Sequence, residues 1–164
     1  MAIRLILRYP DSRLSQPAEP VTSFDPALRQ LADDLLQAMR AAPGVGITAP
    51  HIGVPQRLVV LELPEEKPRT YVNPQILSAS QQTARHTEGS VSMPGATEEV
   101  ERPATIRLRY QDLDGAVHEE DVGGFHAVCM QHEIDQLDGI FWLKRLSRLK
   151  RERLIRRWQK QSAG

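Results

Sequence analysis

The segment that most constrains this chain is residues 123–139, which predicts one helix bounded by glycines. Gly123-Gly124 opens the helix and Gly139 ends it. Within it stands Gln131-His132-Glu133-Ile134-Asp135-Gln136. In the pattern H-E-x-x-H, two histidines one helical turn apart bind one metal ion, and the glutamate between them moves protons. Here the second histidine position, Gln136, carries an amide.

Length and composition predict one globular domain over residues 1–164, large enough to bury a core. The formal net charge is zero, so we expect neither nucleic acid nor a membrane surface as a partner. Cys129 is the only cysteine and cannot form an internal disulfide. Because Arg4 and Arg8 also interrupt any signal-peptide core, we expect a cytoplasmic protein.

The remaining pattern predicts an α+β domain. Asp25-Pro26 marks a helix start and Pro43-Gly44 its end. Residues 148–159 predict a final charged helix. Apolar runs favour strands over residues 57–63, 71–77, 104–110 and 116–122, with a hairpin turn at 112–115. We expect turns or loops at residues 44–53 and 88–95.

Those two loops and the helix form one pattern. Residues 44–53 read GVGITAPHIG, and residues 88–95 read EGSVSMPG. In this order and at these separations, the three segments resemble the peptide deformylase family, whose pattern is G-x-G-x-A-A-x-Q, then E-G-C-L-S, then Q-H-E-x-D-H. The resemblance covers nearly the whole chain and includes residues 6–11, 71–74, 102–103 and 146–150.

The resemblance implies a peptide deformylase-like fold, with antiparallel β-sheets around a central metallohydrolase-type helix and with N-terminal and C-terminal helices. It also implies a reaction, removal of the formyl group from the N-terminal formyl-methionine of new polypeptides. In the family, ferrous iron, replaceable by zinc or nickel, is held by the cysteine and the two histidines. A metal-bound water attacks the formyl carbon, and the glutamate moves the proton.

Mapped residue by residue, the resemblance keeps one of the three protein ligands of the metal. His132 matches the first histidine, and Glu133 matches the catalytic glutamate. Ser90 stands at the cysteine position and Gln136 at the second histidine position. A hydroxyl and a carboxamide are poor substitutes for a thiolate and an imidazole on a transition metal.

The resemblance also assigns oxyanion and cleft residues. His51 stands where the family has a glutamine that steadies the oxyanion, and Val91 supplies the backbone amide for the same role. Thr48 replaces an alanine of the first motif. Arg102 is expected to face a substrate carbonyl. The expected substrate pocket consists of Gly46, Ile47, Glu88, Arg102, Phe125, Val128 and Cys129.

The ligand changes predict weak metal binding. Structural zinc sites contribute roughly 10–16 kcal/mol over about four ligands, or about 3 kcal/mol each. Degrading two ligands therefore costs about 6 kcal/mol, roughly four decades of affinity. We expect no cofactor, or Fe²⁺, Zn²⁺ or Ni²⁺ held only weakly.

Three hypotheses of function follow. The first is a protein without deformylase activity that still binds peptide N-termini or a related small ligand. The second is an active metal-dependent amidohydrolase with an altered centre, in which His51 and His132 hold a displaced metal together with Gln136 or Glu133. The third is a non-catalytic interaction protein. A metal-free pair of Ser90 and His132 is a further possibility, but no third group to orient the histidine is identifiable.

Overall fold

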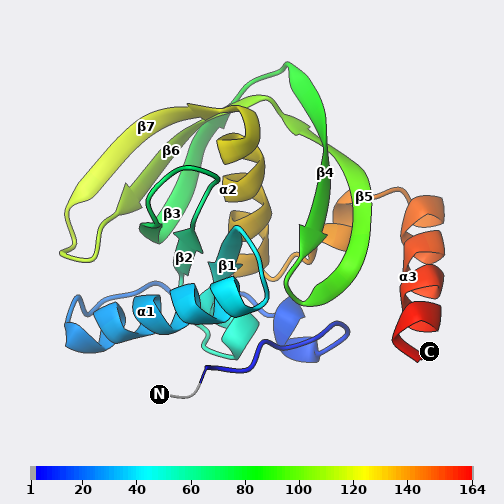
Figure 1. Cartoon of the computed structure of the whole chain (residues 1–164). Helices are drawn as coiled ribbons and strands as arrows, with labels where there is room; N and C mark the ends of the chain where they lie inside the picture. Colours follow the sequence, from blue (N-terminus) through cyan, green and yellow to red (C-terminus); the bar gives the residue numbers. More distant parts are fainter. Residues whose placement is uncertain (1–2, 164) are drawn as a thin grey trace.

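The computed structural model describes residues 3–163 and shows helices and antiparallel sheets arranged around one central helix (Figure 1). The helices are α1 (Pro26–Ala41), α2 (Gly124–Leu137) and α3 (Arg148–Ala163). The strands are β1 (Gly46–Thr48), β2 (Leu58–Leu61), β3 (Arg69–Ala79), β4 (Thr83–Ser90), β5 (Met93–Pro103), β6 (Thr105–Gln111) and β7 (Val117–Gly123). The predicted α+β fold is confirmed.

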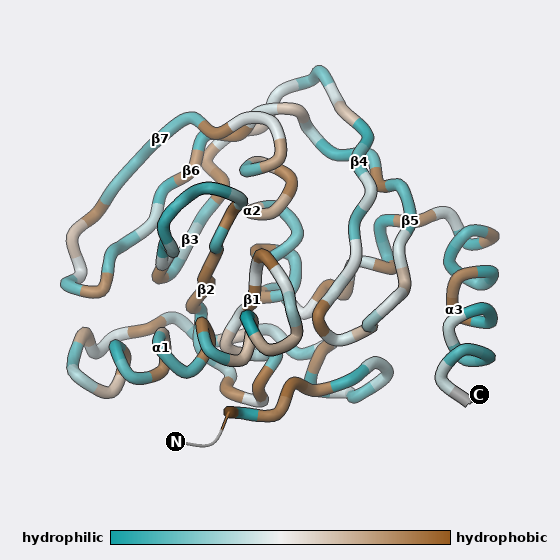
Figure 2. Tube along the Cα trace, viewed as in Figure 1, coloured by the Kyte–Doolittle hydropathy of each residue, from teal (hydrophilic) through white to brown (hydrophobic). Residues whose placement is uncertain are grey.

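Two sheets enclose α2. A five-stranded antiparallel sheet has the order β1-β2-β3-β6-β7, and β4 and β5 form a separate two-stranded sheet. Figure 1 shows α2 standing between the larger sheet and the β4–β5 hairpin. In Figure 2, β2 is coloured as hydrophobic along its length, whereas α3 is mostly hydrophilic. Because α2 stands between the larger sheet and the β4–β5 hairpin, one side of α2 faces the smaller sheet.

Helix α2 is buried along most of its length, from Ala127 to Leu137. Its apolar side chains, among them Met130 and Ile134, join one core cluster with Val59 of β2 and Leu108 of β6. A helix covered on every side cannot leave its polar groups to water, so each polar side chain on it needs a partner within the protein. The positions of those partners define the chemistry of the site.

Several predicted boundaries are confirmed. The helix predicted from Asp25-Pro26 is α1, and the side chain of Asp25 accepts a hydrogen bond from the backbone N–H of Leu28 over 3.0 Å. The four predicted strands correspond to β2, β3, β6 and β7. The predicted turn at residues 112–115 does connect β6 to β7. The prediction of one domain over residues 1–164 stays a prediction.

The predicted loop at residues 88–95 is wrong. Its residues form the end of β4, a tight turn at Val91-Ser92 and the start of β5. The hairpin is rich in charged residues, with Arg85 facing Glu99 and Glu101 across the two strands, and it lacks the β-branched and aromatic run that indicates a strand. Likewise, part of the glycine-rich segment is the short strand β1.

Among residues 3–163, no helix is long and apolar enough to cross a membrane.

Candidate functional site

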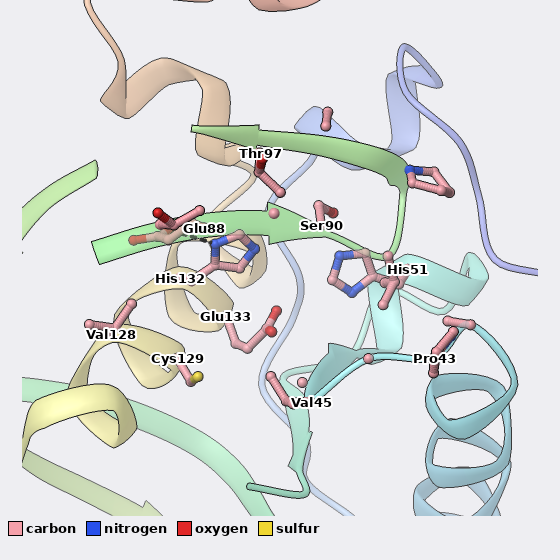
Figure 3. Close-up of a pocket in the computed structure, with 18 of the residues that line it drawn as sticks. Pro43, Val45, His51, Glu88, Ser90, Thr97, Val128, Cys129, His132 and Glu133 are labelled. Carbon is pink, nitrogen blue, oxygen red and sulfur yellow. Dashed lines mark hydrogen bonds and ion pairs between the residues drawn. The ribbon is translucent and has the colours of Figure 1, made fainter. Parts of the chain in front are cut away.

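A cavity of about 470 Å³ opens between α2, residues 42–46 and the β4–β5 hairpin (Figure 3). Most of the side chains that the sequence assigned to the site line it. They are Gly46, His51, Glu88, Ser90, Val91, Phe125, Val128, Cys129, His132 and Glu133. Ile47, Arg102 and Gln136, which we also expected there, are not among its lining residues.

His132 is held in one orientation by Glu88. Its Nδ1 lies 2.7 Å from Oε1 of Glu88, and both side chains are buried. Burial alone would raise the pKa of Glu88, but hydrogen bonds from His132 and Arg102 outweigh it and hold the pKa at about 2. Glu88 is therefore ionised at neutral pH, and Nδ1–H of His132 donates to it, so Nε2 is the ring nitrogen left for the cavity.

Arg102 is buried and pairs with two carboxylates. Its Nε and Nη2 donate to the carboxylate of Glu88 over 2.6 and 2.9 Å, and its Nη1 donates to Asp135 over 2.9 Å. Arg102 is not among the residues that line the cavity, and three of its five N–H groups are paired with carboxylates, so its expected contact with a substrate carbonyl stays a prediction. A buried arginine that is bidentate to one carboxylate is a fixed support for the histidine above it.

The network continues to the end of α2. Asp135 also accepts two hydrogen bonds from Arg145, over 2.8 and 2.7 Å. Two carboxylates, Glu88 and Asp135, thus face two guanidiniums, Arg102 and Arg145, and their charges cancel. Neither Asp135 nor Arg145 was singled out from the sequence as a site residue, since their pairing depends on a fold that brings α2 against the following 3₁₀ helix, Trp142–Arg145.

His51 turns one nitrogen into the cavity without a partner. The backbone N–H of Thr48 donates to Nδ1 of His51 over 2.9 Å, so the neutral ring carries its proton on Nε2. That Nε2 is buried and has no hydrogen-bond partner among the described residues. Burial, and secondarily the nearby His132, lower the pKa of His51 to about 3, so the ring stays neutral.

Glu133 also faces the cavity with an unsatisfied atom. Its Oε1 is buried and has no hydrogen-bond partner among residues 3–163. Burial raises the pKa of this carboxyl to about 7. Gly46 makes room for it: a Cβ at Gly46 would lie 2.4 Å from Oε2 of Glu133. Figure 3 shows Glu133 and His51 on the two sides of the same space.

The donor set does not fit the family's metal. The Nε2 of Gln136 donates to the backbone carbonyl of Leu14 over 2.7 Å. Ser90 accepts a hydrogen bond from the backbone N–H of Ser92 over 3.1 Å. Within residues 3–163, no group of three or more His, Cys, Asp and Glu side chains is placed to hold a metal ion, which gives no support to the displaced site built on His51 and His132.

The structure supplies the third group that the serine–histidine hypothesis lacked. Glu88 orients His132 as the acidic member of a catalytic triad would. However, among the described residues no hydrogen bond joins Ser90 to His132, and Oγ of Ser90 contacts its own turn instead. His132 is therefore oriented as a general base would be, but Ser90 is not hydrogen-bonded to it as a nucleophile would be.

One wall of the cavity is apolar. Val128 and Cys129 are buried on it, and Phe125 lies at the rim with 42% of its surface exposed. Burial, and then the nearby Glu133, raise the pKa of the Cys129 thiol to about 12, so it is not a thiolate nucleophile. This wall therefore offers an apolar contact surface.

Comparison with known proteins agrees with the fold and with the motifs. Residues 3–152 match the sequence profile described as polypeptide deformylase. A "Peptide deformylase-like" protein of Brucella melitensis is 65% identical over 98% of both chains. A "Peptide deformylase" of Afipia carboxidovorans is 46% identical over 98% of this chain and 96% of its own. The crystal structure of peptide deformylase from Ehrlichia chaffeensis is 34% identical and superposes with a TM-score of 0.92 over 99% of this chain and 98% of its own. The chain therefore belongs to the polypeptide deformylase family.

Proposed function

We propose that this member of the family has lost metal-dependent deformylation and keeps the cleft as a binding site for peptide N-termini. The observation that carries the proposal is the orientation of Gln136. Its amide donates to the carbonyl of Leu14 and does not line the cavity, although it occupies the position of the family's second histidine ligand. The substitution thus removes a ligand and also turns the side chain to a structural contact.

The other changed ligand supports the same proposal. Ser90 lines the cavity, but its oxygen already accepts a hydrogen bond from the backbone of Ser92. A neutral alcohol binds Fe²⁺ or Zn²⁺ far more weakly than a thiolate does. Of the three family ligands, only His132 presents a nitrogen that a metal would accept.

Retained binding is supported by the walls of the cavity. The two-stranded sheet has the order β4-β5, so the outer edge of β4 has no strand partner within residues 3–163. Gly89 and Ser90 on this strand line the cavity. An unpaired strand edge beside an apolar pocket is the arrangement that binds extended peptides through backbone hydrogen bonds. Val128 and Cys129 then offer an apolar place for the first side chain.

Metal analysis and an activity assay test the proposal. Gently purified protein should contain no stoichiometric transition metal and should not deformylate formyl-Met-Ala. The double substitution Ser90→Cys with Gln136→His should gain both a bound metal and activity, whereas Ser90→Ala with Gln136→Leu should gain neither. Stoichiometric metal in the parent, with turnover at the ordinary enzymatic scale of about 1–10³ s⁻¹, would contradict the proposal.

A second candidate is an active amidohydrolase with an altered metal centre. It is favoured by the bond between Glu88 and His132, because a carboxylate on the far nitrogen is how metal-binding imidazoles are commonly held. It also agrees with the retention of Glu133. Titration of the protein with Fe²⁺, Zn²⁺ and Ni²⁺ separates the two candidates, since only the second predicts tight binding and activity that depends on the added ion.

The cellular location is part of the proposal. Cys129, the single cysteine, is a buried free thiol. A lone buried thiol suits a reducing compartment, and we propose the cytoplasm.

A further inference from the structure

Two buried polar atoms of residues that line the cleft have no hydrogen-bond partner among residues 3–163. Their chemistry indicates which functional groups a ligand of this cleft should present. Nε2–H of His51 is a donor without an acceptor, and Oε1 of Glu133 is an acceptor without a donor. Both side chains are buried, and both line the cavity. Buried polar groups are nearly always paired, so a ligand that fits here presents an acceptor to His51 and a donor to Glu133.

The charge of Glu133 distinguishes among the ligands that could do this. Among residues 3–163, no lysine or arginine forms an ion pair with Glu133, although Glu88 and Asp135 are both paired with arginines. His132 and Arg102 lie near enough to act on Glu133 electrostatically, but among the described residues neither forms an ion pair with it, and both are bonded to Glu88 instead. The carboxylate of Glu133 is therefore left in an enclosed site without a dedicated cation, which is costly for a buried charge.

We infer that the cleft selects peptides with a free N-terminal amine and an apolar first residue over their formylated forms, with the ammonium bound at Glu133. This inference rests on the proposed function, in which the cleft binds peptide ends without a metal. The ammonium donates to Oε1 of Glu133, and Ser90 lines the same cavity from strand β4. The first carbonyl of the peptide then accepts from Nε2–H of His51.

Formylation removes the positive charge of the peptide N-terminus. It converts the ammonium to a neutral amide with one N–H, which can give Glu133 a hydrogen bond but no compensating charge. The carboxylate would make a charge-assisted hydrogen bond to either ligand, but only the ammonium also compensates the buried negative charge. Since a cation is no longer held by the altered ligands, the free terminus supplies the positive charge that the family's metal would bring.

Calorimetric titration of the native protein with four peptides tests the inference. The peptides are Met-Ala-Ser, its N-formyl and N-acetyl derivatives, and the des-amino analogue, in which a hydrogen atom replaces the terminal amino group. The free amine should bind at least about tenfold more tightly than each of the other three, the scale set by losing one partner of a buried charge pair. The formyl peptide should be recovered intact after the titration.

A matched pair of variants identifies the group responsible. Glu133→Gln has nearly the same shape as the parent and should reduce the preference for the free amine to within about twofold, with little change for the formyl peptide. Glu119→Gln, on strand β7 of the other sheet, should keep the parent's preference. The native peptide series decides the question alone if Glu133→Gln fails to fold.

The outcomes separate the two proposals. Equal or tighter binding of the formyl peptide overturns the inference and leaves peptide-end binding standing. A preference for the free amine that persists unchanged in folded Glu133→Gln also overturns it. No binding of any of the four peptides, or deformylation of the formyl peptide during the titration, contradicts the proposed function and the inference together.

Discussion

The backbone amide of Thr48 donates to Nδ1 of His51 over 2.9 Å, and the hydroxyl of Thr48 lies 2.9 Å from the same nitrogen. Both residues depart from the family pattern, which has an alanine and a glutamine at these positions. The two departures contact each other, so they form one local arrangement. It fixes the His51 ring with Nε2–H toward the cavity, where the family's glutamine would direct an amide N–H.

Replacing Thr48 with valine tests what fixes this tautomer. The backbone donor remains in Thr48→Val, so His51 should keep its proton on Nε2, and ¹⁵N NMR of the ring nitrogens should show that form unchanged. Loss of the hydroxyl contact should lower the free energy of unfolding by about 1 kcal/mol. A switch of the proton to Nδ1 would show that the hydroxyl, and not the backbone, controls the ring.

The buried carboxyl of Glu133 should make stability fall as pH rises. Its pKa is raised to about 7, whereas the unfolded chain releases this proton near the ordinary value of 4.5. Between these values the folded state binds more protons, so the free energy of unfolding decreases with pH across the window, by on the order of 3 kcal/mol. Glu133→Gln should lack this contribution.

Comparing the parent with Glu133→Gln separates the contribution of the Glu133 carboxyl from that of other titrating groups. Urea unfolding at pH 5 and pH 8 should show that Glu133→Gln gains stability relative to the parent at the higher pH. Glu119→Gln serves as the surface control and should follow the parent at both values. An equal difference between parent and Glu133→Gln at both pH values would mean that the carboxyl ionises normally.

Removing Arg102 should be strongly destabilising. Arg102→Leu leaves Glu88 and part of Asp135 buried without their cation, and breaking a buried pair in this way costs about 3–5 kcal/mol. Arg107→Leu, where the arginine is 40% exposed and pairs with surface carboxylates, should cost less than about 1 kcal/mol. Urea unfolding measures both. A loss below about 1 kcal/mol in Arg102→Leu would show that the network adds little to stability.

Gly46 should be required for the shape of the cleft. In Gly46→Ala, the new Cβ would lie 2.4 Å from Oε2 of Glu133 and 2.9 Å from Cδ2 of Leu61, so at least one of them must move. We expect a cost of about 1–3 kcal/mol and loss of peptide binding. Gly123→Ala, whose Cβ would lie 3.3 Å from Cγ2 of Thr105, should retain binding in the same calorimetric assay. Unchanged binding in Gly46→Ala would show that Glu133 is free to rearrange.

Local signals were sufficient for much of the fold. The bounds of α2 follow from glycines at both ends, since caps act over a few residues. The start of α1 follows from Asp25 and Pro26, and its end from Pro43-Gly44. The β4–β5 hairpin was missed because its stability comes from cross-strand pairs such as Arg85 with Glu101, whose partners are sixteen positions apart and carry no apolar alternation.

The site was likewise predictable only where local sequence motifs define it. The motifs placed His132 and Glu133 on one helix and His51 opposite them, because these residues stand inside recognisable patterns. The partners that decide their behaviour could not be inferred in this way. Glu88 is 44 positions from His132, and Leu14 is 122 positions from Gln136. Such pairings depend on the completed tertiary structure, as does the pairing of Arg102 with Glu88 and Asp135.

The hydrogen bond from Gln136 to the carbonyl of Leu14 couples the site helix to the beginning of the chain. It joins α2 to the 3₁₀ helix Ser12–Ser15 near the start of the chain, so Gln136 connects two segments that are far apart in the sequence. Gln136→His alone would lose this hydrogen bond, so any histidine introduced here acts on the stability of the fold as well as on the site.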